Sequence, residues 1–558
     1  MSKPRNNLFE LMVEGQKLGA FDDRWHGRLA RLWNRGIQDE FLASSLAKRV
    51  QSYRVKAALG QLIPFRPPRL TRKGRGIVFG CDIHGRTVFI PVEFLRAHLL
   101  APGNTGAGKS NLIAFVIPQI AALGCAVWLV DLYKTQNRRL RPIFHQHGRE
   151  LVILRPIDFR INPLQAWDND PRDHLSLTVG RLVRILDLPP RASMILGQIC
   201  HELYREFGIW DGQKDRWPTL FHVYERVRNQ PGLNAPAREA ILDRLGSLLI
   251  RLTPAVAAHY SGWNPVELAK RSIDFEMTGA PIEVRQFLVE HCIDFVFQRE
   301  VERGVVNGPL DLFIAFDDAQ RFFNSEAGQM NGMDEKIGVT RGCGKSIGVF
   351  CQTLHGLSQH LMPNLATKMH GRLGTHDDWA AMGRHLGLNS EQVQWSKQNL
   401  SPGRFVGALA EGSWHEPFVF DVPLVDLSQP VTDADAAASR AGLNKLPVTP
   451  ADEYRNWSPY QELEAPSAQT ATSAQPKLSD PELRFLKSIA ENVGEASGFH
   501  AKAAGVNGKK ARQIRERLVR DGFVAEHKIQ IGGRRPSVVL ELLPAGKAAL
   551  GASQGGGI

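Results

Sequence analysis

The residues best suited to carry chemistry are GNTGAGKS, residues 103–110, which fit the pattern Gly-x-x-x-x-Gly-Lys-Ser. Glycines let a backbone wrap closely around a phosphate, so that successive N–H groups and the N-terminus of the following helix point at it. Lys109 would place a positive charge at the β- and γ-phosphates of ATP, and the Ser110 hydroxyl is a ligand for Mg²⁺. The nucleotide-binding residues predicted from this segment are Gly103, Asn104, Thr105, Gly106, Ala107, Gly108, Lys109, Ser110 and Asn111.

A pair of acids, Asp317 and Asp318, follows the apolar run LFIAF at 312–316. Because the carboxyl ends of parallel strands meet at one edge of a sheet, we expect this pair beside the phosphate loop. Asp317 is then expected to hold Mg²⁺ through water, and Asp318 to orient and deprotonate the attacking water. The alternative is that two acids simply end a strand.

The elements around these residues predict an α/β fold. A strand-like run precedes the loop, a helix follows it, and the segments 126–134 and 150–156 are expected to be strands. Alternation of strand and helix predicts a parallel, doubly wound sheet. Pro118 predicts a kink in the helix after the loop. The apolar stretch 111–133 suggests a membrane span, but a helix followed by a buried strand explains it better, and we expect no transmembrane segment.

Composition divides the chain into regions with different expected structures. Residues 426–477 are rich in Ala, Ser, Thr, Pro and Gln, which predicts a flexible linker. The other predicted regions are a mainly helical region at 1–70, an ATPase core at 71–167 and 301–425, an all-helical insertion at 168–300, a compact domain at 478–550 and a disordered tail at 551–558.

The segment 478–550 is predicted to form a winged helix-turn-helix, with three helices followed by a hairpin that turns at Gly532 and Gly533. Residues 477–558 hold 14 Lys plus Arg against 8 Asp plus Glu. A basic third helix suits the major groove of DNA, and arginines at a hairpin tip suit phosphates. Docking onto another protein is the alternative. The predicted DNA-binding residues are Lys509, Lys510, Arg512, Gln513, Arg517, Arg534 and Arg535.

The overall charge also favours a polyanionic partner. The 558 residues include 69 Lys plus Arg and 57 Asp plus Glu, a formal charge of +12, and nucleic acid is the first candidate for such a surface. The six cysteines are scattered without any Cys-x-x-Cys pair, which predicts reduced thiols in a cytoplasmic protein. The amino terminus lacks the apolar core of a signal peptide.

Taken in order, a series of segments resembles the HerA/FtsK superfamily of ring-shaped DNA-pumping ATPases, which includes conjugative coupling proteins of the TraG/TraD kind. The resemblance implies a RecA-like core with an all-helical insertion, a hexameric ring, and ATP hydrolysis coupled to movement along double-stranded DNA. The segments are HLLAPGNTGAGKSN, VWLVDLYK, LRPIDFRINPL, WPTLFHVYERV, SIDFEM, AFDDAQRF, TRGCGKSIGVFCQT and LSPGRFVGALAEGSWHEPFVFDVP, spread over residues 75–425.

The resemblance also assigns roles to single residues. Gln352 matches the position that senses the γ-phosphate, and Asp318 matches the acidic base, where the family usually has Glu. Arg372 matches an arginine that reaches across the ring into a neighbour's site, with Arg341 as the alternative; a trans arginine makes hydrolysis depend on assembly. Coupling proteins and FtsK normally carry membrane helices near the amino terminus, so the expected lack of them here favours the soluble HerA branch.

The leading hypothesis is therefore an ATP-driven translocase of double-stranded DNA that acts as a homo-hexamer. Two alternatives stay open: an ATP-gated DNA-binding regulator, and a coupling protein that passes DNA to a conjugation or secretion channel made by other chains. The sequence shows no nuclease motif, so DNA cleavage would require a partner nuclease. Conjugative transfer, DNA end resection, segregation and phage defence all use such motors, and the sequence does not choose among them.

Overall fold

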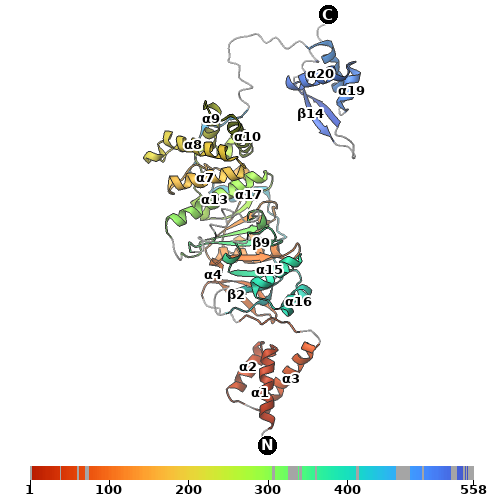
Figure 1. The fold of residues 1–558 in the computed structure, drawn as a ribbon. Coiled ribbons are helices and arrows are strands. Elements are labelled where there is room, and N and C mark those ends of the chain that lie inside the picture. Colours follow the sequence, from red (N-terminus) through yellow and green to blue (C-terminus); the bar gives the residue numbers. More distant parts are fainter. Residues whose placement is uncertain are drawn as a thin grey trace. The chain divides into compact units, whose positions relative to one another are not determined.

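The computed structural model describes residues 3–37, 39–58, 62–68, 74–304, 308–323, 337, 342–358, 361–409, 414–459, 478–492, 495–529, 537–543, 547 and 550. The chain divides into two compact units, Met1–Leu463 and Glu464–Ile558 (Figure 1). All six cysteines lie in the first unit as free thiols, and five of them are buried.

The first unit begins with three helices, α1 (Lys3–Lys17), α2 (Arg24–Asn34) and α3 (Glu40–Ala58). Met12, Leu29, Leu42 and Leu46 form a core of their own between these helices. The Asp23 carboxylate caps α2 by accepting the N–H groups of its first turn. These residues form a small helical bundle.

One 11-stranded sheet organises the rest of this unit, in the order β2-β1-β12-β11-β10-β3-β9-β8-β4-β7-β5. The strands are β1 (Gly76–Asp82), β2 (Thr87–Pro91), β3 (Leu99–Pro102), β4 (Ala126–Asp131), β5 (Leu151–Leu154), β7 (Ser272–Glu276), β8 (Leu312–Asp317), β9 (Lys345–Cys351), β10 (Thr367–His370), β11 (Arg404–Leu409) and β12 (Phe418–Asp421). Neighbouring strands are parallel from β10 to β5 and antiparallel from β10 to β2.

The strand order confirms the predicted fold class. β3 leads into the phosphate loop, and a single strand, β9, separates it from β8, which carries the acid pair. This is the arrangement of a RecA-like P-loop ATPase, in which the loop and the acids share the carboxyl edge of the sheet. The sheet is mixed rather than wholly parallel, because β11, β12, β1 and β2 extend it with antiparallel strands.

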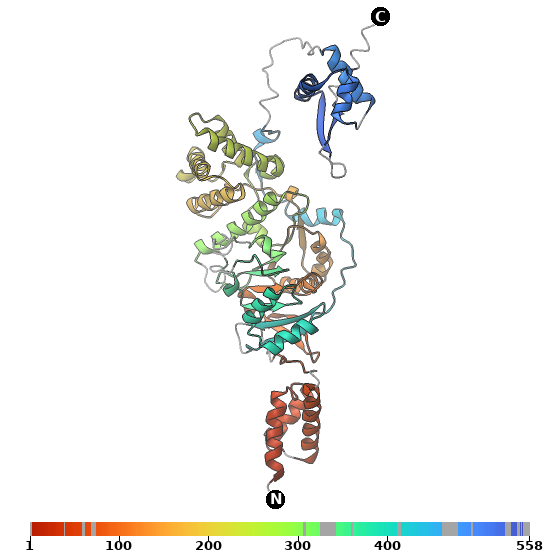
Figure 2. The same cartoon turned by 45° about the vertical axis from the view of Figure 1, so that its right-hand side comes forward.

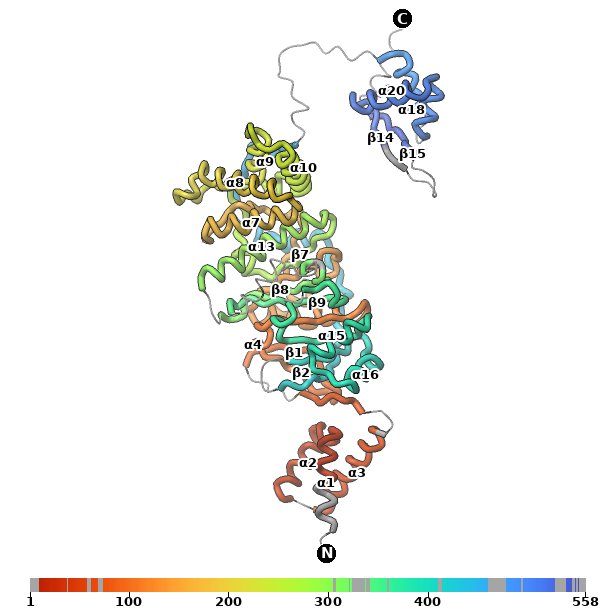
Figure 3. Tube along the Cα trace, viewed as in Figure 1, coloured from red at the N-terminus to blue at the C-terminus, as the bar shows by residue number. Residues whose placement is uncertain are grey.

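The central strands are buried on both faces, as their apolar runs predict. In β4, Trp128 and Val130 belong to one hydrophobic cluster, whereas Val127 and Leu129 belong to the other. The alternation follows the two-residue period of a strand, so the sheet separates two cores. One core is covered by α5 (Lys109–Ala122) and the other by α13 (Ile282–Glu302). Figure 3 traces the chain through these layers.

The apolar stretch 111–133 forms most of α5, a turn at Gly124, and β4. α5 continues through Pro118, and the next residue, Gln119, fastens the helix to β1. Its side-chain amide accepts from the Val78 N–H and donates to the Val78 carbonyl, both at 2.9 Å. In the part of the chain that the structure describes, no helix is both long and apolar enough to cross a membrane.

The predicted all-helical insertion at 168–300 is wrong from about residue 258 onward. Its helices are α7 (Pro171–Ile185), α8 (Pro190–Glu206), α9 (Leu220–Asn229), α10 (Ala235–Leu252) and α11 (Pro254–Ala257), followed by β6 (His259–Ser261) and α12 (Pro265–Ala269). β7 then enters the main sheet between β4 and β5, so α12 and α13 belong to the core. The insertion proper ends near residue 257, because a strand paired on both sides cannot lie outside the sheet it completes.

Other α-helices of the core, among the residues that the structure describes, are α4 (Val92–Arg96), α6 (Arg141–Gln146), α15 (His376–Leu386) and α16 (Ser390–Asn399).

The predicted flexible linker at 426–477 is wrong for residues 426–459, which pack against the core. We call residues 423–458 the strap. It contains α17 (Asp433–Ser439) and β13 (Thr449–Pro450), and Figure 2 shows it running from β12 alongside the sheet to α17. Ala436 and Leu443 are fully buried. The small side chains that suggest a linker instead let α17 lie close against β5.

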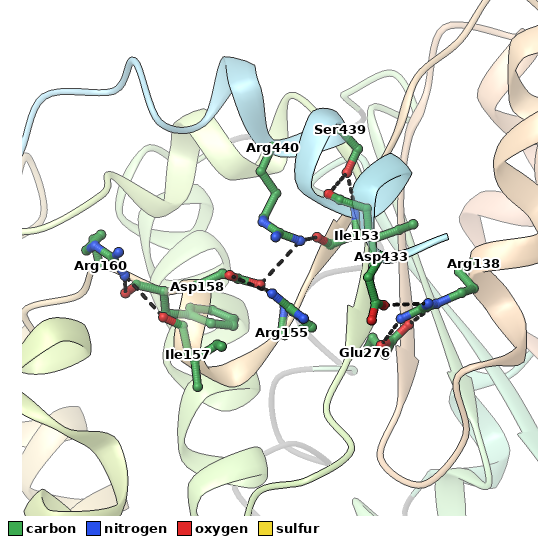
Figure 4. A network of polar contacts seen from close by, with 12 residues as sticks. Arg138, Ile153, Arg155, Ile157, Asp158, Arg160, Glu276, Asp433, Ser439 and Arg440 are labelled. Atoms are coloured by element: carbon green, nitrogen blue, oxygen red, sulfur yellow. Dashed lines mark hydrogen bonds and ion pairs between the residues drawn. The ribbon is translucent and has the colours of Figure 1, made fainter. Parts of the chain in front are cut away.

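Polar contacts hold the strap to the edge of the sheet (Figure 4). The Ser439 hydroxyl accepts from the Ile153 N–H at 3.0 Å. Arg440 donates to the Ile153 carbonyl at 3.0 Å and forms an ion pair with Asp158 at 3.3 Å. Farther along, the Trp457 indole donates to Glu225 of α9 at 3.1 Å. The strap therefore joins the sheet to the helical insertion. Residues 460–477 lie outside the described residues.

The second unit contains α18 (Asp480–Glu491), α19 (Ser497–Ala503), α20 (Gly508–Arg520) and the antiparallel strands β14 (Val524–Ile529) and β15 (Ser537–Leu542). Its core includes Phe485, Leu486, Ile514 and Leu518. Three helices followed by two paired strands is the predicted order of elements, and the assignment as a winged helix stays a prediction. The predicted hairpin tip, residues 532–535, lies outside the described residues.

Ala436→Glu should loosen the strap, because it would bury an unpaired carboxylate against β5. Ala437→Glu is the matched control, since Ala437 is exposed on the same helix. Limited proteolysis followed by mass spectrometry should show cleavage within 423–458 about tenfold faster in Ala436→Glu than in the wild type or the control. Equal rates in the three proteins would contradict the packing of this segment.

Candidate nucleotide-binding site

The phosphate loop between β3 and α5 takes its shape from glycines. Gly106 has a φ of +83° and Gly108 a φ of +97°, a left-handed region that other residues rarely adopt. At Gly108 a side chain is disfavoured by the positive φ and is also excluded by a clash, because a Cβ would lie 2.6 Å from the Gly403 nitrogen. α5 begins at Lys109 immediately after this residue, so the unpaired N–H groups of its first turn face the loop.

Three distant segments hold the loop by its backbone. The Gly103 N–H donates to the Cys351 carbonyl at 3.0 Å, and the Asn104 N–H donates to the Arg372 carbonyl at 2.7 Å. On the other side, the Gly403 N–H donates to the Ala107 carbonyl at 3.0 Å. Residues at the ends of β9, β10 and β11 therefore fix the conformation that the glycines permit.

Lys109 is buried at the base of the loop. Its ammonium donates to the Gly103 carbonyl and, at 3.2 Å, to the Asn104 carbonyl. Burial lowers the pKa of Lys109, and the nearby carboxylates of Asp317 and Asp318 oppose that shift. The cation is thus held inside the curve of the loop, and its contact with phosphates stays a prediction.

The acid pair ends β8 beside the loop, as predicted. Burial raises the pKa of Asp317, and the Lys134 cation opposes the rise. Burial would also raise the pKa of Asp318, but hydrogen bonds from Gln352 and Lys134 outweigh it and leave that pKa lowered. Asp318 is therefore the more firmly ionised of the two carboxylates. It has a φ of +55°, a strained value that turns the chain away at the end of the strand.

Gln352 joins the loop to the acid pair. Its amide nitrogen donates to Asp318 Oδ1 at 2.8 Å, and its carbonyl oxygen accepts from the Thr105 hydroxyl at 3.3 Å. The segment after Gln352 is held by Asp378 of α15, which accepts from the Thr353 hydroxyl and the Leu354 N–H. The structure thus places Gln352 between the phosphate loop and Asp318, where a γ-phosphate sensor is expected.

Two loop residues have other partners. The Ser110 hydroxyl accepts from the Gln136 amide at 3.2 Å. The Asn111 amide donates to the Pro423 carbonyl at 2.9 Å and accepts from the Val425 N–H at 2.8 Å. The Asn111 side chain therefore anchors the start of the strap to α5, and a contact of this residue with nucleotide stays a prediction.

Of the two candidate arginines, the structure describes Arg372 but not Arg341. Arg372 follows β10 and contacts the phosphate loop through its own carbonyl. Its side chain is exposed, and no described residue forms a hydrogen bond or ion pair with its guanidinium. Arg341 lies outside the described residues.

Lys134 is a site residue whose role the sequence reasoning missed. Its ammonium lies 3.3 Å from Asp317 Oδ2 and 3.1 Å from Asp318 Oδ2. Burial alone would lower the pKa of Lys134, but the two carboxylates outweigh it and raise that pKa. The available signal was its position three residues beyond the end of β4, because that strand ends at the same edge of the sheet as β8.

In the second unit, four of the predicted DNA-binding side chains are exposed on α20, namely Lys509, Lys510, Arg512 and Gln513. Arg517 has a different role, because it pairs with the buried Glu482 at 2.9 Å and with Asp521 at 3.4 Å. Its guanidinium fastens α20 to α18, and a contact of Arg517 with DNA stays a prediction. Arg534 and Arg535 lie outside the described residues.

Comparison with solved structures finds similar chains. VirB4 of Thermoanaerobacter pseudethanolicus aligns with a TM-score of 0.48 and 15% identity over 63% of this chain and 98% of that chain. The plasmid coupling protein TrwB with the ATP analogue ADPNP aligns with a TM-score of 0.43 and 13% identity over 66% of this chain and 98% of that chain. TrwB in complex with ADP and Mg²⁺ gives a TM-score of 0.44 and 15% identity over the same shares.

No family model matches the sequence, and no curated protein matches it. Every one of the reported TM-scores is below 0.5, so the assignment of the fold rests on the strand order and on the geometry of the loop.

Asp131 at the end of β4 should make stability depend on pH. Burial raises its pKa from 3.8 to about 6, so the folded chain binds this proton more readily than the unfolded chain. The contribution of the protonated Asp131 to the free energy of unfolding is fully present below pH 4 and is lost as the pH rises through 6. Between pH 5 and pH 7 the loss is roughly 1 kcal/mol.

Asp131→Asn should remove this loss, because an amide does not ionise. The apparent free energy of urea unfolding, measured at pH 5 and pH 7, should therefore fall less in the variant than in the wild type. Asp452→Asn is the control, since Asp452 is exposed. Identical pH slopes for Asp131→Asn and the wild type would show that Asp131 does not titrate in this range.

Proposed function

We propose that this chain is a Mg²⁺-dependent ATPase that moves double-stranded DNA. The observation that carries the proposal is the convergence of Lys109, Asp318 and Gln352 at one edge of the sheet, linked through Thr105 and Lys134. A phosphate-binding lysine, an ionised carboxylate and an amide that contacts both the loop and the carboxylate are the groups that ATP hydrolysis requires.

The site fits a nucleotide with Mg²⁺. Ser110 and Asp317 offer hydroxyl and carboxylate oxygens, which are the ligands that Mg²⁺ prefers. Gly103 is part of the cradle, since a Cβ there would lie 3.0 Å from the Ala107 Cβ. When bound, the ion would neutralise charge that develops on the phosphates. TrwB has been solved with an ATP analogue and with ADP and Mg²⁺, which agrees with this choice of ligand.

The chain's own residues divide the chemistry. Lys109 would exchange its two carbonyl partners for phosphate oxygens, because a charged acceptor binds an ammonium more strongly. Asp318 would orient the attacking water and take its proton. Since hydrogen bonds keep its pKa low, it is a weak base and acts mainly by orienting the water. Gln352 would change its hydrogen bonds to Thr105 and Asp318 when the γ-phosphate is lost.

We further propose that the chain works as a homo-hexamer, in which Arg372 serves a neighbouring site. Arg372 lies at the rim of the loop with an exposed side chain and no described partner, which leaves it free to meet an adjacent subunit. A guanidinium that arrives in trans would stabilise the transferring phosphoryl group only in the assembled ring.

The second unit is proposed to engage DNA. Lys509, Lys510, Arg512 and Gln513 are exposed on one helix, and the order of three helices and a paired hairpin suits a winged helix whose third helix enters the major groove. This unit would retain the motor on duplex, while hydrolysis in the first unit moves it.

Lys109→Ala should abolish ATP hydrolysis and triplex displacement while leaving DNA binding by the tail unit intact. Lys397→Ala, an exposed lysine on α16, is the matched control and should behave as the wild type. Displacement of a third strand from linear duplex, with and without ATP, is the measurement. If the wild-type protein hydrolyses ATP but never displaces the strand, the motor is excluded and an ATP-gated DNA-binding regulator takes its place.

Replacing Lys509, Lys510 and Arg512 together with Ala should weaken DNA binding and flatten its dependence on salt. Each lost phosphate contact should reduce the slope of log affinity against log salt by about 0.9. Lys487→Ala on α18 is the control, because Lys487 is an exposed lysine on another helix of the same unit. An unchanged slope in the triple variant would assign this helix to protein docking instead.

A further inference from the structure

One loop contacts the residues assigned above to the metal and the water. We call Leu132–Leu140 the bridge loop; its second half is the short helix η1 (Gln136–Leu140). Lys134 of this loop bridges Asp317 and Asp318 at 3.3 Å and 3.1 Å. Two residues later, the Gln136 amide donates to the Ser110 hydroxyl. The bridge loop therefore occupies both sides of the proposed metal site.

The Lys134 ammonium and a metal ion would compete for the same oxygens. A Mg²⁺ ion held at Asp317 lies about 2.1 Å from a directly bound oxygen, and roughly 4 Å when it binds through water. Lys134 occupies that shell already, and a cation at such a separation repels its ammonium, although the Lys134 side chain itself is partly exposed while Asp317 is buried. A divalent ion should therefore displace the monovalent ammonium from Asp317.

The other end of the bridge loop is tied to the strap (Figure 4). Arg138 donates to Glu276 at the end of β7 at 2.7 Å and to Asp433 at the start of α17 at 2.9 Å. Glu276 is buried, whereas Asp433 is largely exposed. The bond to Asp433 is the weaker of the two, because solvent competes for an exposed carboxylate.

The loop is short and is held at both of its ends. Asp131 fixes its start by accepting the N–H groups of Tyr133 and Lys134 at 2.8 Å and 3.0 Å, and Leu140 is buried at its end. A cleft of about 560 Å³ separates the loop from strap residues 427–431. The loop can therefore shift into open space, and a shift at Lys134 reaches Arg138 within four residues.

We propose that a metal ion at Asp317 displaces Lys134, and that the bridge loop carries this displacement to the strap by breaking the contact between Arg138 and Asp433. Because the strap also holds the helical insertion through Trp457 and Glu225, metal occupancy would alter how firmly the insertion is fixed to the core. This inference rests on the proposed nucleotide function.

The first test measures competition for the carboxylates in the full-length chain. Mn²⁺ binding in the presence of ADP is followed by electron paramagnetic resonance for the wild type, Lys134→Met and Lys134→Arg. Lys134→Met removes the charge and should tighten the metal by about tenfold, whereas Lys134→Arg keeps the charge and should resemble the wild type. An unchanged or weaker affinity in Lys134→Met would overturn the competition.

The second test measures the response of the strap by hydrogen exchange with mass spectrometry. In the ADP-bound wild type, added Mg²⁺ should raise exchange in residues 426–440, and Lys134→Met should lose that metal-dependent rise. Asp433→Asn cuts the link far from the carboxylates. It should therefore exchange rapidly with or without metal while binding Mn²⁺ as the wild type does.

The outcomes separate this inference from the function on which it rests. If ADP and Mn²⁺ bind but the wild-type strap does not respond to metal, the coupling is overturned and the proposed nucleotide site stands. If ADP fails to bind to the wild-type protein under conditions where Lys109→Ala also fails, both proposals fall. Asp433 is exposed, so its variant tests the coupling even if substitution of Lys134 impairs folding.

Discussion

The close approach of Gly108 to Gly403 is the constraint on which the site depends. The two backbones lie so near that no side chain fits at Gly108, and the adjoining Gly403 N–H binds the Ala107 carbonyl at 3.0 Å. Since Cys351 and Arg372 also bind the loop by their carbonyls, the loop is formed only when β9, β10 and β11 are in place. The candidate nucleotide site therefore depends on the parallel strands β9 and β10 and the antiparallel strand β11, and not on the eight loop residues alone.

Charges at the same edge of the sheet depend on one another. Lys109, Lys134, Asp317 and Asp318 are all at least partly buried, and each shifts the protonation of the others. Burial disfavours every one of these charges, but the two cations stabilise Asp318 as a carboxylate, and the carboxylates stabilise Lys134 as an ammonium. The arrangement keeps ionised groups ready beside the phosphate loop, and it makes any added cation a competitor for Lys134.

The strap extends this edge across the molecule. It leaves α5 at Asn111, meets the bridge loop at Arg138, packs on β5 through α17, and reaches the insertion at Trp457. Each contact is modest, because several involve half-exposed side chains, but they occur in series along one covalent chain. A change at the acid pair has a continuous physical route to helices that lie outside the sheet.

The sequence by itself determined the phosphate loop, the acid pair and the central strands, because each depends on local patterns: glycines that permit positive φ, acids that end an apolar run, and unbroken β-branched and aromatic segments. It also indicated the fold class, since alternating helices and strands have few solutions. Gln352 was indicated only through resemblance, because a polar residue after a strand has no distinctive local signal.

Tertiary structure decided what each side chain meets. In the folded chain the Asn111 side chain binds the strap, and Arg517 pairs with Glu482. Lys134 contacts two acids that lie more than 180 residues away along the chain. An Ala- and Ser-rich segment of the predicted linker, α17, packs on β5. Small side chains allow close packing as well as flexibility, so composition alone did not distinguish the two. Composition records what a segment contains, whereas its partners are set by strands that come together only in the folded sheet.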